Sequence, residues 1–283
     1  MGICSSDITI TSLETITAFD IANGDHLWTL DELQNATISN TEETSDITGK
    51  QGRRLNTLKL NKSATISGTN GLISSGLMSS QTGATQTTDY TDIMWPEFVT
   101  VSNNTATISY VAVGTAGDEI GSVYVCTGNN TLGTKFEQVA GSTTLTTGKF
   151  HYTPNAVGST TGGTLTFYTG DIANGTEVAV YYKRHISAQI VENNTNEYAK
   201  KVTLYVDAFG EDVCNNVYRI QFYIPRASFN GNFDIAMGDT QAVHAFEATI
   251  LEGGRCESGA NTGLLWNYKI FADNAADVAV SNG

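Results

Sequence analysis

The sequence predicts an all-β protein, built as a β-sandwich or barrel of many short strands. The chain has 283 residues, of which 40% are hydrophobic and only 16% charged, with 28 Gly against 3 Pro. Disordered chains combine low hydrophobicity with a high charge density, so this composition indicates a folded protein. Segments in which apolar and polar residues alternate recur along the chain, separated by clusters of Gly, Asn, Ser and Thr. Strands and turns at this spacing are typical of sandwiches and barrels, and they exclude a helix bundle.

The individual strands are predicted from alternation with a period of two residues. The alternation is clearest in residues 202–206 and 218–224, where every second side chain is apolar. Pro225 is expected to end the second of these strands, because proline has no N–H group to donate to a neighbouring strand. Weaker runs of the same kind predict strands at residues 107–113, 122–126, 165–168, 177–182, 243–251 and 264–271.

Residues 71–81 are the only segment whose pattern clearly predicts a helix, and the segment is short. The apolar stripe of this packing helix consists of Leu72, Ile73, Leu77 and Met78. Asn70 can cap the start of the helix, and Gly83 lies just past its end, where glycine is favoured. Residues 13–21 are a weaker helix candidate, because their Thr content and β-branched side chains disfavour helix.

Residues 40–62 combine opposite charges with few apolar side chains, which predicts a long hairpin arm outside the core. We expect contacts to another copy from Glu42, Glu43, Asp46, Lys50, Arg53, Arg54, Leu55 and Leu58. A hairpin with no core beneath it is marginal in water unless a partner chain covers it. The opposite charges suit self-association, in which the basic tip of one copy meets the acidic patch of another. The alternative is an exposed loop without a partner.

The charge balance excludes nucleic-acid binding through a basic face. The chain has 15 Lys and Arg against 29 Asp and Glu, and its formal net charge of −14 repels phosphate. The cysteines, at positions 4, 126, 214 and 256, lack the spacing of zinc ligands or of a disulfide framework, so free thiols in a reducing compartment are expected. No secretory pattern and no apolar stretch of membrane-spanning length occurs, so we expect folding in a cytoplasm with no membrane partner.

No catalytic, cofactor-binding or metal-ligating residue is predicted. The sequence contains no nucleophile elbow, zinc-protease, phosphate-loop, dinucleotide or calcium-loop motif. The histidines lie far apart, and His244, which alternates with Phe246 in a predicted strand, is interpreted as a half-buried packing residue. Trp28, Trp95 and Trp266 are expected to anchor the core or a subunit contact. These features favour a protein that is not an enzyme.

Several segments together resemble one protein family. Residues 47–83 read ITGKQGRRLNTLKLNKSATISGTNGLISSGLMSSQTG, a charged hairpin that leads into a polar strand, a turn and a short Leu/Met helix. Residues 175–184, 200–210, 217–239 and 243–251 are similar to the sheet strands of the same family. On these residues the chain resembles the major tail tube proteins of long-tailed bacteriophages. The likeness spans most of the chain.

The resemblance implies a structural virion protein with a single β-sandwich of tail-tube type over residues 1–283. Such proteins form rings, usually hexameric, which stack into a hollow tube that conducts the genome during injection. By position, the arm at residues 40–62 would reach the adjacent ring, and the helix at 71–81 would pack on the outside of the sandwich. Residues 110–185 would be an elaboration or a subdomain.

The implied partners are other copies of the chain and other phage tail proteins, in a virion tail assembled in the host cytoplasm. DNA would pass through the lumen without specific binding, and no cofactor is implied. Six copies carry 6 × (−14) = −84 formal charges, which suits an acidic lumen that repels DNA. Two alternatives stay open: a head decoration or baseplate protein, and a carbohydrate-binding β-module that stacks sugars on Tyr181, Tyr182 or Trp95.

Overall fold

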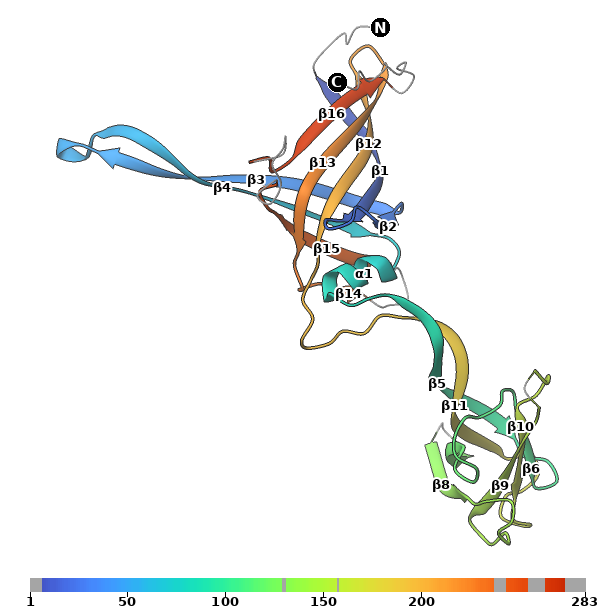
Figure 1. Cartoon of the computed structure of the whole chain (residues 1–283). Helices are drawn as coiled ribbons and strands as arrows, with labels where there is room; N and C mark the ends of the chain where they lie inside the picture. Colours follow the sequence, from blue (N-terminus) through green and yellow to red (C-terminus); the bar gives the residue numbers. More distant parts are fainter. Residues whose placement is uncertain (1–6, 129–130, 157, 237–242, 254–262, 273–283) are drawn as a thin grey trace. The chain divides into compact units, whose positions relative to one another are not determined.

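The computed structural model describes residues 7–128, 131–156, 158–236, 243–253 and 263–272. In these residues strands predominate and one α-helix occurs, which confirms the prediction of an all-β sandwich or barrel with a long hairpin (Figure 1). The chain divides into two compact units, a main unit of residues 1–87 and 191–283 and an inserted unit of residues 88–190. The segment 110–185, in which the sequence predicts an elaboration, lies inside the inserted unit.

The main unit is one sheet that closes over a core. Its strands are β1 (Ile8–Asp20), β2 (His26–Leu30), β3 (Leu33–Thr48), β4 (Arg54–Asn70), β12 (Lys201–Asp212), β13 (Val217–Phe229), β14 (Ile235–Ala236), β15 (Val243–Ile250) and β16 (Asn267–Ala272). They pair in the order β2-β1-β12-β13-β15-β4-β3, with β16 on β13 and β14 on β15. The first half of β13 pairs with β16, and its last residues pair with β15. Strand β13 therefore belongs both to the layer of β1, β2, β12 and β16 and to the layer of β3, β4 and β15. Between the layers Ile16, Ile66, Leu204 and Ile224 are fully buried.

Pro225 lies inside β13, so the prediction that it ends the strand is wrong. The register between β12 and β13 shifts at this point, and two residues, Pro225 and Arg226, lie opposite the single residue Thr203. Such a bulge accommodates proline because the missing N–H group leaves no ladder hydrogen bond unmade. The hydroxyl of Thr203 donates to the carbonyl oxygen of Pro225 at 3.0 Å, which ties the bulge to β12.

Residues 13–20 belong to β1, so the weaker helix prediction for 13–21 is also wrong. Ile16 and Ala18 are buried, whereas Thr17 and Phe19 on the other side of the strand are only partly buried. This is the period of a strand, and the β-branched residues that disfavour helix fit a pleated sheet well. Pairing with β12 on one side and β2 on the other settles the conformation.

Helix α1 (Ser75–Thr82) begins later than the sequence predicts, because Asn70 is still part of β4. Asn70 donates from its amide to the carbonyl oxygen of Leu72 at 2.7 Å, which forms a turn. Ser74 is the actual N-cap, and its hydroxyl accepts from the N–H of Leu77 at 3.2 Å. Two members of the predicted packing stripe therefore precede the helix and are exposed, and two lie in it: Leu72 and Ile73, then the fully buried Leu77 and the half-buried Met78.

Gly83 ends α1 in the left-handed conformation with φ of 85°, which confirms its predicted place past the helix. A Cβ atom at Gly83 would collide with the backbone carbonyl of Tyr198. We expect Gly83→Ala to lower the free energy of unfolding by about 2–4 kcal/mol, from the left-handed backbone and the collision together. Gly24→Ala is the control, because φ is 74° there but no atom lies within 4 Å of the added Cβ, so the backbone cost of about 1 kcal/mol acts alone. Urea unfolding measures both, and equal losses would contradict the collision.

The inserted unit is a second sheet with a separate core. Its strands are β5 (Thr87–Thr100), β6 (Thr105–Ile108), β7 (Ile120–Thr127), β8 (Thr131–Gln138), β9 (Lys149–Pro154), β10 (Gly163–Phe167) and β11 (Glu177–Ile190), in the order β5-β11-β7-β8-β9-β10-β6. Val123, Phe150, Leu165 and Val180 are fully buried in it. The strand predicted at 107–113 is replaced by β6, which ends at Ile108.

Candidate functional site

The hairpin of β3 and β4 extends beyond the core of the main unit (Figure 1). At the inner ends of the strands Ala64 and Ile66 are buried, but every residue from 40 to 63 is exposed except the half-buried Gly49. A 3-10 turn, Lys50–Gly52, closes the tip, where Gln51 has a φ of 66°. We call residues 40–62 the arm. At roughly 3.3 Å per residue, each strand of the arm spans about 30 Å.

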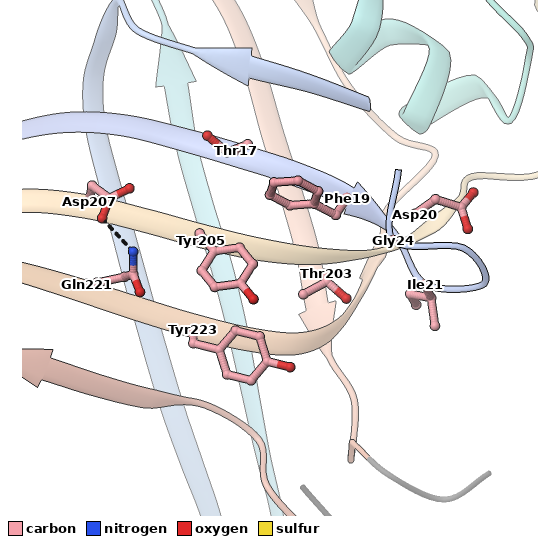
Figure 2. A pocket seen from close by; sticks show the side chains of 10 residues that line it. All are labelled: Thr17, Phe19, Asp20, Ile21, Gly24, Thr203, Tyr205, Asp207, Gln221 and Tyr223. Carbon is pink, nitrogen blue, oxygen red and sulfur yellow. Dashed lines mark hydrogen bonds between the residues drawn. The ribbon is translucent and has the colours of Figure 1, made fainter. Parts of the chain in front are cut away.

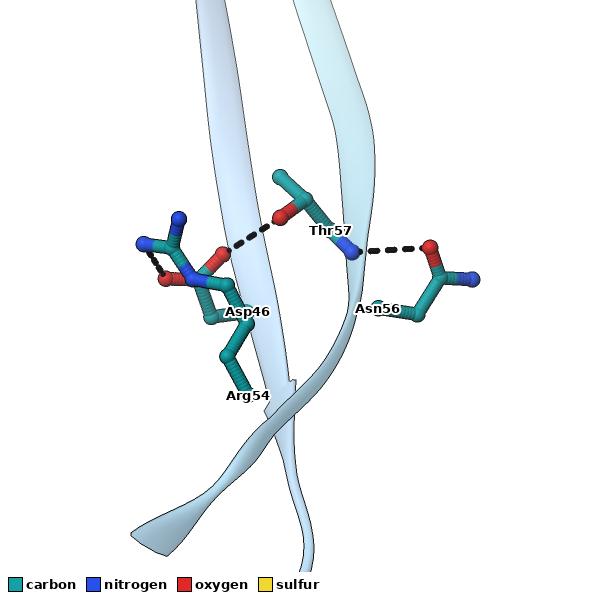
Figure 3. A network of polar contacts seen from close by, with 4 residues as sticks. All are labelled: Asp46, Arg54, Asn56 and Thr57. Carbon is teal, nitrogen blue, oxygen red and sulfur yellow. Dashed lines mark hydrogen bonds and ion pairs between the residues drawn. The ribbon is translucent and has the colours of Figure 1, made fainter.

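One face of the arm carries ion pairs between its two strands. Asp46 pairs with Arg54 through one carboxylate oxygen, and its other oxygen accepts the hydroxyl of Thr57 at 2.8 Å (Figure 3). Lys59 pairs with Glu42 at 3.0 Å on the same face. Exposed pairs of this kind contribute less than about 1 kcal/mol each, so their main effect is on strand register. The acidic patch that the sequence offers to another copy is thus largely paired within its own hairpin.

The arm is nevertheless basic overall. Its charged residues are Lys50, Arg53, Arg54, Lys59 and Lys62 against Glu42, Glu43 and Asp46, which gives 5 − 3 = +2. The rest of the chain therefore carries −14 − 2 = −16. Lys50 and Arg53, at the tip, make no ion pair with any residue that the structure describes. The net charge of the arm is thus opposite in sign to that of the rest of the chain.

The opposite face of the arm carries three apolar side chains, and Glu43, Ser45 and Asn56 share this face. Ser45 pairs with Leu58 across the hairpin, so Ile47 on β3 shares a face with Leu58 and Leu60 on β4. Their side chains are 43%, 44% and 46% exposed, respectively. We call Ile47, Leu58 and Leu60 the apolar stripe. Leu55, which the sequence also predicts as a contact residue, lies at the tip against Gly49 and is 65% exposed.

The base of the arm is attached to β16 and β13 by an aromatic cluster. Trp266 donates from its indole N–H to the side-chain oxygen of Asn40 at 3.3 Å, and its ring lies 6.1 Å from that of Phe222. An open apolar cavity of about 430 Å³ adjoins this cluster, with Ile10 and Leu13 on its other side. Ile10 is 53% exposed, whereas Ile66, Val206 and Ala208, which also line the cavity, are buried.

A pocket of about 590 Å³ lies on the side of β1, β12 and β13 that faces away from the core (Figure 2). The rings of Phe19, Tyr205 and Tyr223 line it in sequence across the strands, with centroids 5.6 and 5.0 Å apart. Asp207 accepts from the amide of Gln221 at 3.0 Å. Among the described residues the titratable side chains of its lining are Asp20, Asp207, Tyr205 and Tyr223, and no His, Cys, Lys or Arg lines it.

His244 is fully buried, and not half-buried as the sequence predicts. Its Nε2 lies 2.7 Å from the side-chain oxygen of Gln81, and its Nδ1 accepts from the backbone N–H of Ser74 at 3.3 Å. A neutral ring with its proton on Nε2 satisfies both partners. His244 therefore joins β15 to α1, and burial lowers its pKa.

The free energy of unfolding should depend on pH through His244. Burial holds the pKa of His244 below its ordinary value of 6.5, so the unfolded chain takes up this proton at a higher pH than the folded chain. The stabilisation is full above pH 6.5 and is lost as the pH falls through the folded pKa. We expect His244→Gln to weaken the decline of the urea midpoint between about pH 7.5 and about pH 5.5. His26→Gln, at an exposed histidine, should keep the wild-type decline, and an unchanged decline in His244→Gln would contradict the assignment.

The fold and the arm together define an all-β protein whose long hairpin extends beyond its core. Among the described residues no group of three or more His, Cys, Asp or Glu side chains could hold a metal ion. The one helix of the described residues is too short to cross a membrane. The chain belongs to the YomU/Tube protein family, whose profile matches residues 8–258, and it is accordingly a phage tube-type structural protein. No curated protein sequence matches the chain.

Proposed function

We propose that the chain polymerises as stacked hexameric rings into the hollow tail tube of a phage, through which the genome passes during injection. The observation that carries the proposal is the arm, whose apolar stripe has no core of its own chain beneath it. Contiguous exposed apolar surface marks a contact site. In the proposal the arm reaches the adjacent ring, where Leu55, Leu58 and the tip residues Lys50 and Arg53 make the contact.

Unpaired strand edges of the main unit support ring formation. In the described residues β3 pairs only with β4, β16 pairs only with β13, and β2 covers only residues 16–19 of β1. Long open edges lead to aggregation unless another strand or chain covers them. Head-to-tail contacts that close by rotation give a ring, and stacked rings give a filament. If neighbouring copies cover these edges, the edges are protected from aggregation and the copies are held together in a ring.

The two units take different roles in this proposal. The main unit is the tail-tube sandwich, because it carries the arm and the open edges. The inserted unit, which contains the segment 110–185, is an elaboration of it. Assembly takes place in the host cytoplasm with other tail proteins as partners and requires no cofactor.

Two of the three aromatic side chains that the carbohydrate-binding alternative requires, Tyr182 and Trp95, already contact other residues of the chain. Tyr182 is 1% exposed, and its hydroxyl donates to Glu97 at 2.7 Å, so it cannot stack on a sugar. Trp95 is occupied by the guanidinium of Arg184, which lies 4.7 Å from its ring centroid. Only Tyr181 lines an open groove.

Electron microscopy of the concentrated chain tests the proposal. We expect hollow tubes of uniform width with six-fold symmetry in end views. A decoration or baseplate component would instead give single particles, or closed rings that do not stack. Saturable binding of the unassembled chain on a glycan array would favour the carbohydrate-binding module.

A further inference from the structure

The side of β3, β4 and β15 that faces away from the core carries hydroxyl groups along most of its length. Its side chains are Asn35, Thr37, Ser39 and Thr41 on β3, Ser63, Thr65 and Ser67 on β4, and Ala245, Glu247 and Thr249 on β15. Thr69 stands on the same side of β4, but its hydroxyl is buried. The alternate residues, among them Ile66 and Phe246, point into the core. We call this side the hydroxyl face. Glu247 is the one charged residue among these positions. Phe233 and Asp234 adjoin the hydroxyl face at a hollow of about 420 Å³. Arg226 lies past the end of β15, where its carbonyl oxygen accepts from the N–H of Leu251.

The other outward side of the main unit, on β1, β12, β13 and β16, has a different chemistry. Its large side chains are the rings of Phe19, Tyr205, Phe209, Tyr223 and Phe271, and its charged residues are the basic Lys201, Arg219 and Lys269 and the acidic Asp207 and Glu211. We call it the aromatic face; three of its rings appear in Figure 2. The guanidinium of Arg219 lies 5.1 Å from the ring centroid of Phe209, which confirms that the two share this face.

The two faces differ in the groups that hold nucleic acid. Lys and Arg neutralise phosphates and release counterions, which is the source of nonspecific binding. Aromatic rings stack on exposed bases. Ser and Thr hydroxyls exchange hydrogen bonds with water at little net gain, so a phosphate backbone can pass them without being retained. The positions of the hydroxyl face contain neither basic nor aromatic residues.

We propose that the hydroxyl face lines the conduit through which DNA passes. The inference rests on the proposed tube and names the surface of that tube that meets the genome. The same strands, β3 and β4, continue into the arm, so one hairpin would both stack the rings and line the bore. The strand positions of the hydroxyl face then contribute −1 per copy from Glu247, or 6 × (−1) = −6 in a ring of six, and Asp234 at the adjoining hollow adds one further negative charge per copy. In this proposal the lumen is lined mainly by hydroxyl groups and repels DNA weakly, in contrast to the strongly acidic lumen expected from the net charge of the chain.

Heavy-atom labelling of assembled tubes locates the two faces. Ser67→Cys on the hydroxyl face and Thr17→Cys on the aromatic face are each reacted with a mercury compound before assembly. Labelled wild-type tubes show the density that the native cysteines contribute. Thr37→Cys on the hydroxyl face and Thr9→Cys on the aromatic face form a second pair of variants. We expect the difference density of Ser67→Cys at the wall of the central channel and that of Thr17→Cys at a larger radius. The reverse order overturns the inference and leaves the tube in place, whereas a wild-type chain that builds no tubes overturns both.

Retention of DNA tests the chemical role of the face. Thr37→Lys with Ser67→Lys adds basic groups to the hydroxyl face, and Thr9→Lys with Thr17→Lys adds the same charge to the aromatic face. At low salt, we expect tubes of the first variant to hold at least ~10-fold more nuclease-resistant short duplex DNA than wild-type tubes and to release it as salt is raised. Tubes of the second variant should stay at the wild-type level, because DNA bound outside is digested. Equal amounts of protected DNA in both variants would overturn the inference.

Discussion

Leu58→Glu is expected to raise the concentration at which the chain assembles into tubes by about 10- to 100-fold. Leu58 lies on the apolar stripe of the arm with 44% of its side chain exposed, so in the proposed tube a neighbouring copy covers it. Covering the exposed part of a leucine contributes about 1–2 kcal/mol, and burying a carboxylate in its place adds a further cost. Each factor of ten in concentration corresponds to about 1.4 kcal/mol. Sedimentation over a concentration series, with electron microscopy of the pellet, measures the effect.

Thr44→Glu is the matched control for this variant. Thr44 pairs with Lys59 on the ion-paired face of the same hairpin, beside the Ser45 to Leu58 pair. It therefore adds the same charge to the arm without touching the stripe, and we expect a change of no more than about twofold, typical of an exposed charge. Neither residue is in the core, so both variants should keep the wild-type melting temperature. Equal effects would show that the charge of the arm, and not its apolar stripe, makes the contact.

Excision of residues 88–190 is expected to leave a folded main unit that still builds tubes. The inserted unit has its own core, and the main unit keeps all of its sheet pairings without it. The ends of the excised segment lie together, because β5 and β11 run side by side. Val101 exchanges backbone hydrogen bonds with Gly175 and Thr176. Nine residues before Val101 on β5, Asp92 contacts His185, which lies nine residues after Thr176 on β11. The same antiparallel register brings the start of β5 opposite the end of β11. A short Gly/Ser linker from Thr87 to Val191 therefore closes the gap.

Circular dichroism and electron microscopy of the excised chain measure the outcome. Deletion of residues 44–56 provides the contrast, since it removes a much shorter segment yet takes away the tip of the arm and Ile47 of the apolar stripe. We expect that smaller deletion to abolish tubes and to leave the main unit folded. An excised chain that is insoluble, or that folds and stays unassembled, would contradict the assignment of the inserted unit as an elaboration.

Part of the candidate site can be predicted from the sequence. The hairpin, its charges and Leu58 all follow from composition and local pattern in residues 40–62. The sequence does not predict Ile47 as a contact residue, because it stands alone among polar residues. Only the cross-strand register places it on the same face as Leu58 and Leu60. The register also pairs Asp46 with Arg54 and Glu42 with Lys59, which removes most of the acidic patch from the contacts available to another copy. The contact that we propose is therefore made by an apolar stripe and a basic tip, and not by charge-to-charge docking.

The sequence by itself determined the fold class, the long hairpin and the position of Gly83, because alternation, turn residues and glycine conformation are local properties. Only the tertiary structure decided what depends on pairing between distant segments. It placed Pro225 in a bulge opposite Thr203, made β1 a strand by pairing it with β12, and buried His244 between β15 and α1. It also separated the hydroxyl face from the aromatic face. Each strand reads locally as alternating polar and apolar residues, and which strands share an outward side depends on the register of residues that lie far apart in the chain.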